Sequence, residues 1–146
     1  MVNMLLVQGA NMNHLGRREP EHYGTITAAE LDALLHDDAQ AHGDQLEIFY
    51  TNLEGEAMNR IYAAAAAGVQ GLVMNPAGFT HAGYALRDCL KAVALPYVEV
   101  HMTNIERRGI RSVTAEVANG LIAGLGVQSY VLALAAMRLL LATRKR

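Results

Sequence analysis

Short apolar runs alternate along this chain with stretches whose apolar residues recur at helical spacing. The runs are candidate strands at residues 4–7, 46–50, 71–74 and 97–100. Apolar runs of this length suit strands buried on both faces, and helical segments between strands make neighbouring strands parallel. The pattern predicts an α/β fold, a doubly wound parallel sheet in a single domain over residues 1–146. The second run is the most mixed in polarity, so we expect that strand at the sheet edge.

Local signals place helices between the runs. Thr27 and Glu30 stand three residues apart before an apolar periodic stretch, which is the spacing of a capping box. Asn52 is placed to cap the following helix. A final helix is predicted over residues 127–143. Residues 120–126 fit either a short fifth strand or a helix end.

The final predicted helix, residues 127–143, is apolar nearly all round. One face of a sheet cannot cover such a helix, so we expect part of it to pack against another subunit in a homo-oligomer. The alternative is a monomer whose last helix is poorly patterned. The longest apolar tract, residues 131–142, is too short for a membrane span. The N-terminal apolar run is too short for a signal peptide, so the sequence predicts a cytoplasmic protein with no membrane partner.

Composition excludes several kinds of site. The net charge is −2, and the only basic run is the last three residues, so no nucleic-acid partner is expected. The one cysteine, Cys89, lies in an apolar context, which leaves no internal disulfide and no paired-cysteine motif. The sequence has no glycine-rich nucleotide-binding motif and no cluster of histidines or carboxylates. We therefore predict no cofactor and no metal.

Amide, carboxylate and imidazole groups occur at the ends of three predicted strands. Asn11 follows the first strand, Asn75 the third, and Glu99 and His101 close the fourth. His81 falls in the first turn after the third strand. Ligands of open α/β sheets bind beyond the carboxyl ends of the strands. Although each residue alone is a weak signal, their convergence predicts a site at that edge.

A segment of about a dozen residues without apolar periodicity, residues 12–24, follows the first strand. A loop of that length in a small domain is commonly a lid or binding loop. It contains Arg18 and Tyr23, and a guanidinium near a phenol favours the phenolate. Tyr23 as a base and His101 as an acid, oriented by Glu99, suit proton abstraction beside a carbonyl followed by loss of a leaving group. The alternative is a solvated surface loop.

The chain resembles the type II 3-dehydroquinate dehydratases (type II dehydroquinases) over nearly its whole length. The motifs that carry this resemblance are, in order, QGANMNHLGRREPEHYG, NPAGFTH, ALRD and VEVHMTN. The resemblance implies a flavodoxin-like fold with five parallel strands, a strand near residues 120–125, and a dodecamer built as a tetramer of trimers. It also implies a hydro-lyase of the shikimate pathway. Such an enzyme converts 3-dehydroquinate to 3-dehydroshikimate by trans dehydration through an enolate, without metal or Schiff base.

The resemblance implies catalytic roles for five residues. Tyr23 would remove the proton next to the ketone, and Arg18 would hold the phenolate. Asn11 would help to stabilise the enolate. His101, oriented by Glu99, would protonate the departing hydroxyl.

The resemblance also implies how substrate is held. Asn75 and His81 would bind ring hydroxyls. The backbone N–H groups of Met102 and Thr103 would bind the carboxylate. Asp88 would contribute from a neighbouring subunit.

The chain departs from the family pattern at three places. Residues 8–11 read Gln-Gly-Ala-Asn where the family usually has Asn-Gly-Pro-Asn, and Thr103 replaces a serine. Residues 105–112 are shorter by about three residues than usual and differ in polarity. The arginine that binds a ring hydroxyl is assigned to Arg111, with Arg108 as the second choice. Two alternatives stay open: the same elimination on a related hydroxylated cyclohexanone carboxylate, and an inactive flavodoxin-like binding protein.

Overall fold

Five parallel strands form the centre of the molecule in a computed structural model, which describes residues 1–17 and 19–144. The sheet order is β2-β1-β3-β4-β5, and all four neighbouring pairs are parallel. The strands are β1 (Asn3–Ala10), β2 (Gln45–Tyr50), β3 (Gly71–Ala77), β4 (Tyr97–His101) and β5 (Gly120–Ala123). The predicted α/β fold is confirmed, as are the edge position of β2 and the fifth strand near residue 120.

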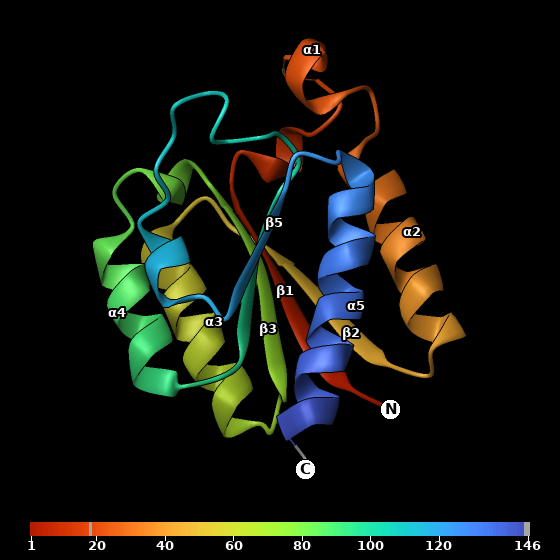
Figure 1. Cartoon of the computed structure of the whole chain (residues 1–146), viewed down its shortest axis with the longest axis vertical. Helices are drawn as coiled ribbons and strands as arrows, with labels where there is room; N and C mark the ends of the chain where they lie inside the picture. Colours follow the sequence, from red (N-terminus) through yellow and green to blue (C-terminus); the bar gives the residue numbers. More distant parts are fainter. Residues whose placement is uncertain (18, 145–146) are drawn as a thin grey trace.

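Helices cover both faces of this sheet, as a doubly wound fold requires. The helices are α1 (Pro20–Tyr23), α2 (Ala28–Ala41), α3 (Glu54–Ala66), α4 (Tyr84–Val93) and α5 (Val127–Arg144), with short 3-10 helices η1 (Met12–His14), η2 (Gly78–Thr80) and η3 (Thr114–Val117). Figure 1 shows α2 and α5 on one face and α3 and α4 on the other. Each face has its own apolar core, with Leu35 and Leu134 in one and Ile61 and Leu86 in the other.

Local details both confirm and correct the sequence predictions. Thr27 and Glu30 form the predicted capping box at the start of α2. Asn52 does not cap α3, because its Oδ1 accepts a hydrogen bond of 2.7 Å from the backbone N–H of Asn11. β1 runs three residues beyond the predicted apolar run, to Ala10, because pairing with β3 continues as far as Ala77.

The close approach of β1 and β3 requires glycine at position 9. A Cβ atom built on Gly9 would meet the carbonyl oxygen of Pro76, with only 2.2 Å between them. No side chain fits at that separation, so Gly9 allows the two strands to stay paired near their carboxyl ends. This pairing also fixes the position of Asn75, which precedes Pro76 near the carboxyl end of β3.

Helix α5 is apolar on more than its core face. Tyr130, Leu134 and Met137 are buried against the sheet, whereas Leu132 is 44% and Leu139 is 70% exposed. The homo-oligomer expected from this pattern stays a prediction. Within residues 1–17 and 19–144, no helix has both the length and the apolar character needed to cross a membrane.

Candidate active site

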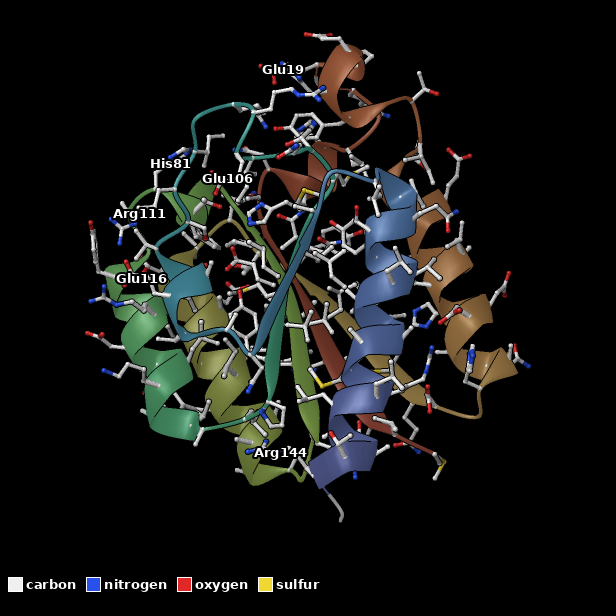
Figure 2. The ribbon with its side chains drawn as sticks, viewed as in Figure 1. Glu19, His81, Glu106, Arg111, Glu116 and Arg144 are labelled. Carbon is white, nitrogen blue, oxygen red and sulfur yellow. The ribbon has the colours of Figure 1, made fainter. Side chains whose placement is uncertain are left out.

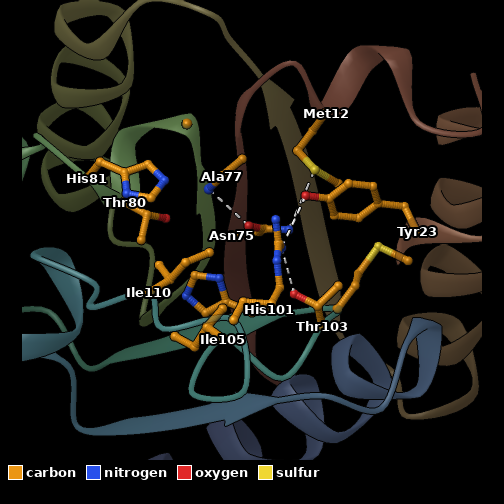
Figure 3. Close-up of a pocket in the computed structure, with 13 residues that line it drawn as sticks. Met12, Tyr23, Asn75, Ala77, Thr80, His81, His101, Thr103, Ile105 and Ile110 are labelled. Carbon is orange, nitrogen blue, oxygen red and sulfur yellow. Dashed lines mark hydrogen bonds between the residues drawn. The ribbon is translucent and has the colours of Figure 1, made fainter. Parts of the chain in front are cut away.

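A pocket lies at the carboxyl ends of the central strands, where the polar residues were expected to converge (Figure 3). It encloses about 130 Å³. A cavity of about 150 Å³ holds benzene, so this pocket suits a ligand built on one six-membered ring. Of the residues named from sequence, seven line the pocket: Tyr23, Asn75, His81, His101, Met102, Thr103 and Arg108.

Tyr23 comes to this pocket from the end of α1 and meets a guanidinium there. Arg108 Nη1 lies 3.4 Å from the Tyr23 hydroxyl and donates a 3.0 Å hydrogen bond to Thr103 Oγ1. The centre of the guanidinium is 5.9 Å from the centroid of the tyrosine ring. Arg18, the partner predicted from sequence, lies outside the described residues. Among the described residues, Arg108 of the segment 105–111 places a cation next to the phenol.

His101 is held by a buried carboxylate on the same face of β4. Its Nε2 lies 2.7 Å from Glu99 Oε2. Burial would raise the pKa of Glu99, but hydrogen bonds from His101, Ser112, Thr114 and Tyr97 together lower it. Since an ionised carboxylate only accepts hydrogen bonds, Nε2 carries the hydrogen and Nδ1 is left for a ligand. The predicted pairing of Glu99 with His101 is confirmed by this geometry.

The amide of Asn75 is fixed by contacts from three elements. Its Nδ2 donates a 2.8 Å hydrogen bond to the Tyr130 hydroxyl and a longer one, 3.6 Å, to the Met12 sulfur. Its Oδ1 accepts a 3.0 Å bond from the Ala77 N–H. The Tyr130 hydroxyl in turn donates to Gln8 Oε1 at 2.8 Å. Sulfur is a weak acceptor, so a ligand oxygen can replace Met12 as the partner of the second amide hydrogen.

Arg111, the first choice for the ring hydroxyl, lies outside the pocket lining, whereas Arg108, the second choice, lies in it. The Arg111 side chain is 87% exposed, and its Nη2 donates to Glu116 Oε1 at 2.9 Å, beside α4 (Figure 2). Arg108 and Ile110 line the pocket instead. In a short loop the side chains of Ile110 and Arg111 point to different sides, so only one of these neighbours can face the ligand.

Two further predicted residues lie outside the pocket lining. Asn11 is exposed, with a positive φ of 72° where the chain turns from β1 into η1. Asp88 is exposed on α4, with its Oδ1 3.6 Å from Arg87 Nε. The part predicted for Asp88 in a neighbouring subunit stays a prediction.

Several site residues were missed from sequence. Tyr97 is two residues before Glu99 on the same strand, so strand alternation could have placed it on the same face. Thr114 and Tyr130 reach the site from distant segments, and no local pattern marks them. Across the described part of the chain, no group of three or more histidine, cysteine or carboxylate side chains could hold a metal ion. The geometry places a phenol, an imidazole paired with a carboxylate, and polar anchors around a ring-sized space.

Comparisons with known proteins agree with this geometry. Residues 2–138 match the family model described as dehydroquinase class II. The 3-dehydroquinate dehydratase of Thioalkalivibrio sulfidiphilus is 43% identical over 92% of this chain and 93% of its own length. 3-Dehydroquinate dehydratase 1 of Pseudomonas putida is 44% identical over 92% of this chain and 91% of its own length.

Solved structures of type II dehydroquinases have the same fold as this chain. A type II dehydroquinase from Butyrivibrio crossotus superposes with a TM-score of 0.90 at 34% identity, covering 94% of this chain and 97% of its own. A type II dehydroquinase from Propionibacterium acnes superposes with a TM-score of 0.87 at 36% identity, covering 97% and 98%.

Proposed function

The chain belongs to the class II dehydroquinase family, and from that premise we propose that it removes water from 3-dehydroquinate to give 3-dehydroshikimate by way of an enolate. The observation that carries the mechanism is the presence of Tyr23 and His101 in one ring-sized pocket. An elimination needs a base for a carbon-bound proton and an acid for the leaving hydroxyl. It needs no covalent intermediate.

Tyr23 is the base in this proposal. Its phenolate oxygen takes the proton from the carbon beside the ketone, and the electron pair of that C–H bond moves into the ring as an enolate. Arg108 Nη1 lies 3.4 Å from the hydroxyl, and its positive charge would stabilise negative charge on that oxygen. Arg18, on the same loop as Tyr23, keeps its predicted role of holding the phenolate.

His101 completes the elimination. Its protonated ring donates the Nδ1 hydrogen to the departing hydroxyl, the C–O bond breaks with its electron pair, and water leaves. The enolate then collapses to the conjugated enone. The carboxylate of Glu99, with its Oε2 2.7 Å from Nε2, orients the ring so that Nδ1 faces the substrate. The pair thus provides an acid on the side of the substrate opposite Tyr23.

The remaining pocket groups hold the substrate. Asn75 and His81 bind ring hydroxyls, and the backbone N–H groups after β4, at Met102 and Thr103, bind the carboxylate. Residues 12–24 act as a lid that brings Tyr23 to the substrate. In the predicted dodecamer, Asp88 completes the site of a neighbouring subunit.

One observation favours a second candidate substrate. Ile105 and Ile110 form an apolar wall of the pocket, in the segment that departs from the family pattern. An apolar wall does not hydrogen-bond a ring hydroxyl, and a site discriminates strongly only for the groups it bonds. A related cyclohexanone carboxylate with one hydroxyl fewer is therefore the alternative for the same elimination.

The deciding experiment follows the conjugated enone by its absorbance. Purified protein is given 3-dehydroquinate and, in parallel, an analogue that lacks one ring hydroxyl. We expect enone from 3-dehydroquinate at the higher kcat/KM. Preference for the analogue would support the second candidate. Binding of both ligands without enone would identify an inactive binding protein and refute the proposed activity.

A further inference from the structure

We propose that Tyr97 and Thr114 are positioning residues for His101. They act through the carboxylate of Glu99 and set the acid limit of the pH range in which the enzyme is active. This inference rests on the proposed role of His101 as the acid. It adds two residues that touch neither the pocket nor a ligand. Ser112 joins this cluster through its contact with Thr114.

The two hydroxyls hold one oxygen of the carboxylate. Tyr97 Oη donates to Glu99 Oε1 at 2.6 Å, and Thr114 Oγ1 donates to the same oxygen at 2.5 Å. The other oxygen, Oε2, is left to His101 Nε2 at 2.7 Å. With one oxygen held twice, the carboxylate cannot rotate about its axis, and Oε2 stays directed at the imidazole.

The hydrogens can be assigned along this cluster. An ionised carboxylate only accepts, so both hydroxyl hydrogens point to Glu99. Ser112 Oγ lies 3.2 Å from Thr114 Oγ1, and the Ser112 hydroxyl also bonds the Glu99 carboxylate. Burial, more than the charge of Glu99, raises the pKa of Tyr97 well above its ordinary value, so the tyrosine stays a donor at every working pH.

The cluster is sealed from solvent. Tyr97, Glu99 and Thr114 are each at most 1% exposed, and His101 and Ser112 are 5% exposed. A carboxylate buried to this degree stays ionised only when donors surround it. Apolar side chains of similar size would fill positions 97 and 114 equally well. The hydroxyls there therefore act on the charge of Glu99 and not only on packing.

The cluster predicts a specific pH dependence. The groups facing the carboxylate are Tyr97 and His101 from β4, Ser112 from the segment before η3, and Thr114 at the start of η3. Among these only the tyrosine and the histidine titrate. With all donors present Glu99 is ionised well into acid. When a donor is removed, the carboxyl protonates at a higher pH, and a neutral carboxyl no longer orients His101 as a charged acceptor of its Nε2 hydrogen.

The test compares Thr114→Val, Tyr97→Phe and Thr114→Ser with the exposed control Tyr84→Phe. We measure kcat and KM for 3-dehydroquinate from neutral to acid pH, and the melting temperature of each variant. The Thr114→Val and Tyr97→Phe variants should each have a kcat about tenfold lower, with KM little changed. The pH below which kcat declines should be higher by about one unit in both. The Thr114→Ser variant keeps a hydroxyl, so its kcat and its pH profile should be close to those of wild type, as should those of the Tyr84→Phe control. A lower melting temperature with an unmoved pH profile would overturn the proposal.

A second readout separates this inference from the proposed function. Nitrogen NMR of the His101 ring reports which nitrogen carries the hydrogen, with or without turnover. For the neutral ring we expect the Nε2–H form in wild type and in Thr114→Ser, and a mixture of both forms in Thr114→Val and Tyr97→Phe. The Nε2–H form unchanged in every variant would refute positioning by the two hydroxyls. A wild-type protein with the expected tautomer but no turnover would refute only the proposed reaction.

Discussion

Replacing Arg108 by alanine should slow turnover much more than it weakens substrate binding. The guanidinium is 3.4 Å from the Tyr23 hydroxyl. At that separation, a positive charge and a phenolate attract by about 1 kcal/mol with the dielectric constant of water and by about 5 kcal/mol with the value of about 20 used near protein surfaces. Because Arg108 is exposed, the lower part of that range applies. The expected fall in kcat is therefore about 10-fold to about 100-fold.

The assay is the steady-state rate of enone formation from 3-dehydroquinate. Arg111→Ala is the matched control, since that guanidinium pairs with Glu116 outside the pocket. Its kcat and KM should stay close to wild type. Equal effects of the two variants, or a larger effect at Arg111, would refute the assignment of the pocket cation to Arg108.

Three other perturbations test the support of the site. Tyr130→Phe removes the acceptor of the 2.8 Å bond from the Asn75 amide, so KM should rise about threefold to about thirtyfold while the protein stays folded; an unchanged KM would contradict the role of that bond. Gly9→Ala places a Cβ against the Pro76 carbonyl. This change should lower the free energy of unfolding, measured in urea, by at least about 2 kcal/mol. A variant as stable as wild type would show that the two strands can move apart freely. Folding lowers the pKa of Glu99 from its ordinary 4.5, so its ionised form stabilises the fold above that value and the contribution is lost as pH falls through the folded pKa. The deficit of Glu99→Gln in unfolding free energy should therefore shrink from neutral to acid pH, and a constant deficit would contradict this.

The sequence was sufficient to predict the sheet and the edge of it at which the site lies. The alternation of apolar runs and helical stretches predicts the parallel sheet, and the carboxyl ends of its strands are where ligands bind in such folds. Asn75 and His101 lie in the pocket for that reason. The side-chain period of two along a strand was sufficient to pair Glu99 with His101.

Loop residues were harder to predict, because no periodicity tells which way they point. Arg108 and Arg111 are both in the segment after β4, and only the folded loop separates the one in the pocket from the one beside Glu116. Asn11 ends a strand, yet the left-handed turn there leaves it out of the pocket lining. Contacts across long separations were also missed, such as the bond from Tyr130 to Gln8, since only the packing of α5 on the sheet brings those residues together.

Turnover of 3-dehydroquinate by the Tyr23→Phe variant tests most directly whether a phenol removes the proton in this site. The substitution keeps the ring that lines the pocket and deletes only the oxygen that would accept the proton. If Tyr23 is the base, kcat should fall by at least about 100-fold with KM nearly unchanged. If the variant turns over at close to the wild-type rate, another group takes the proton, and the mechanism built on Tyr23 and His101 is wrong.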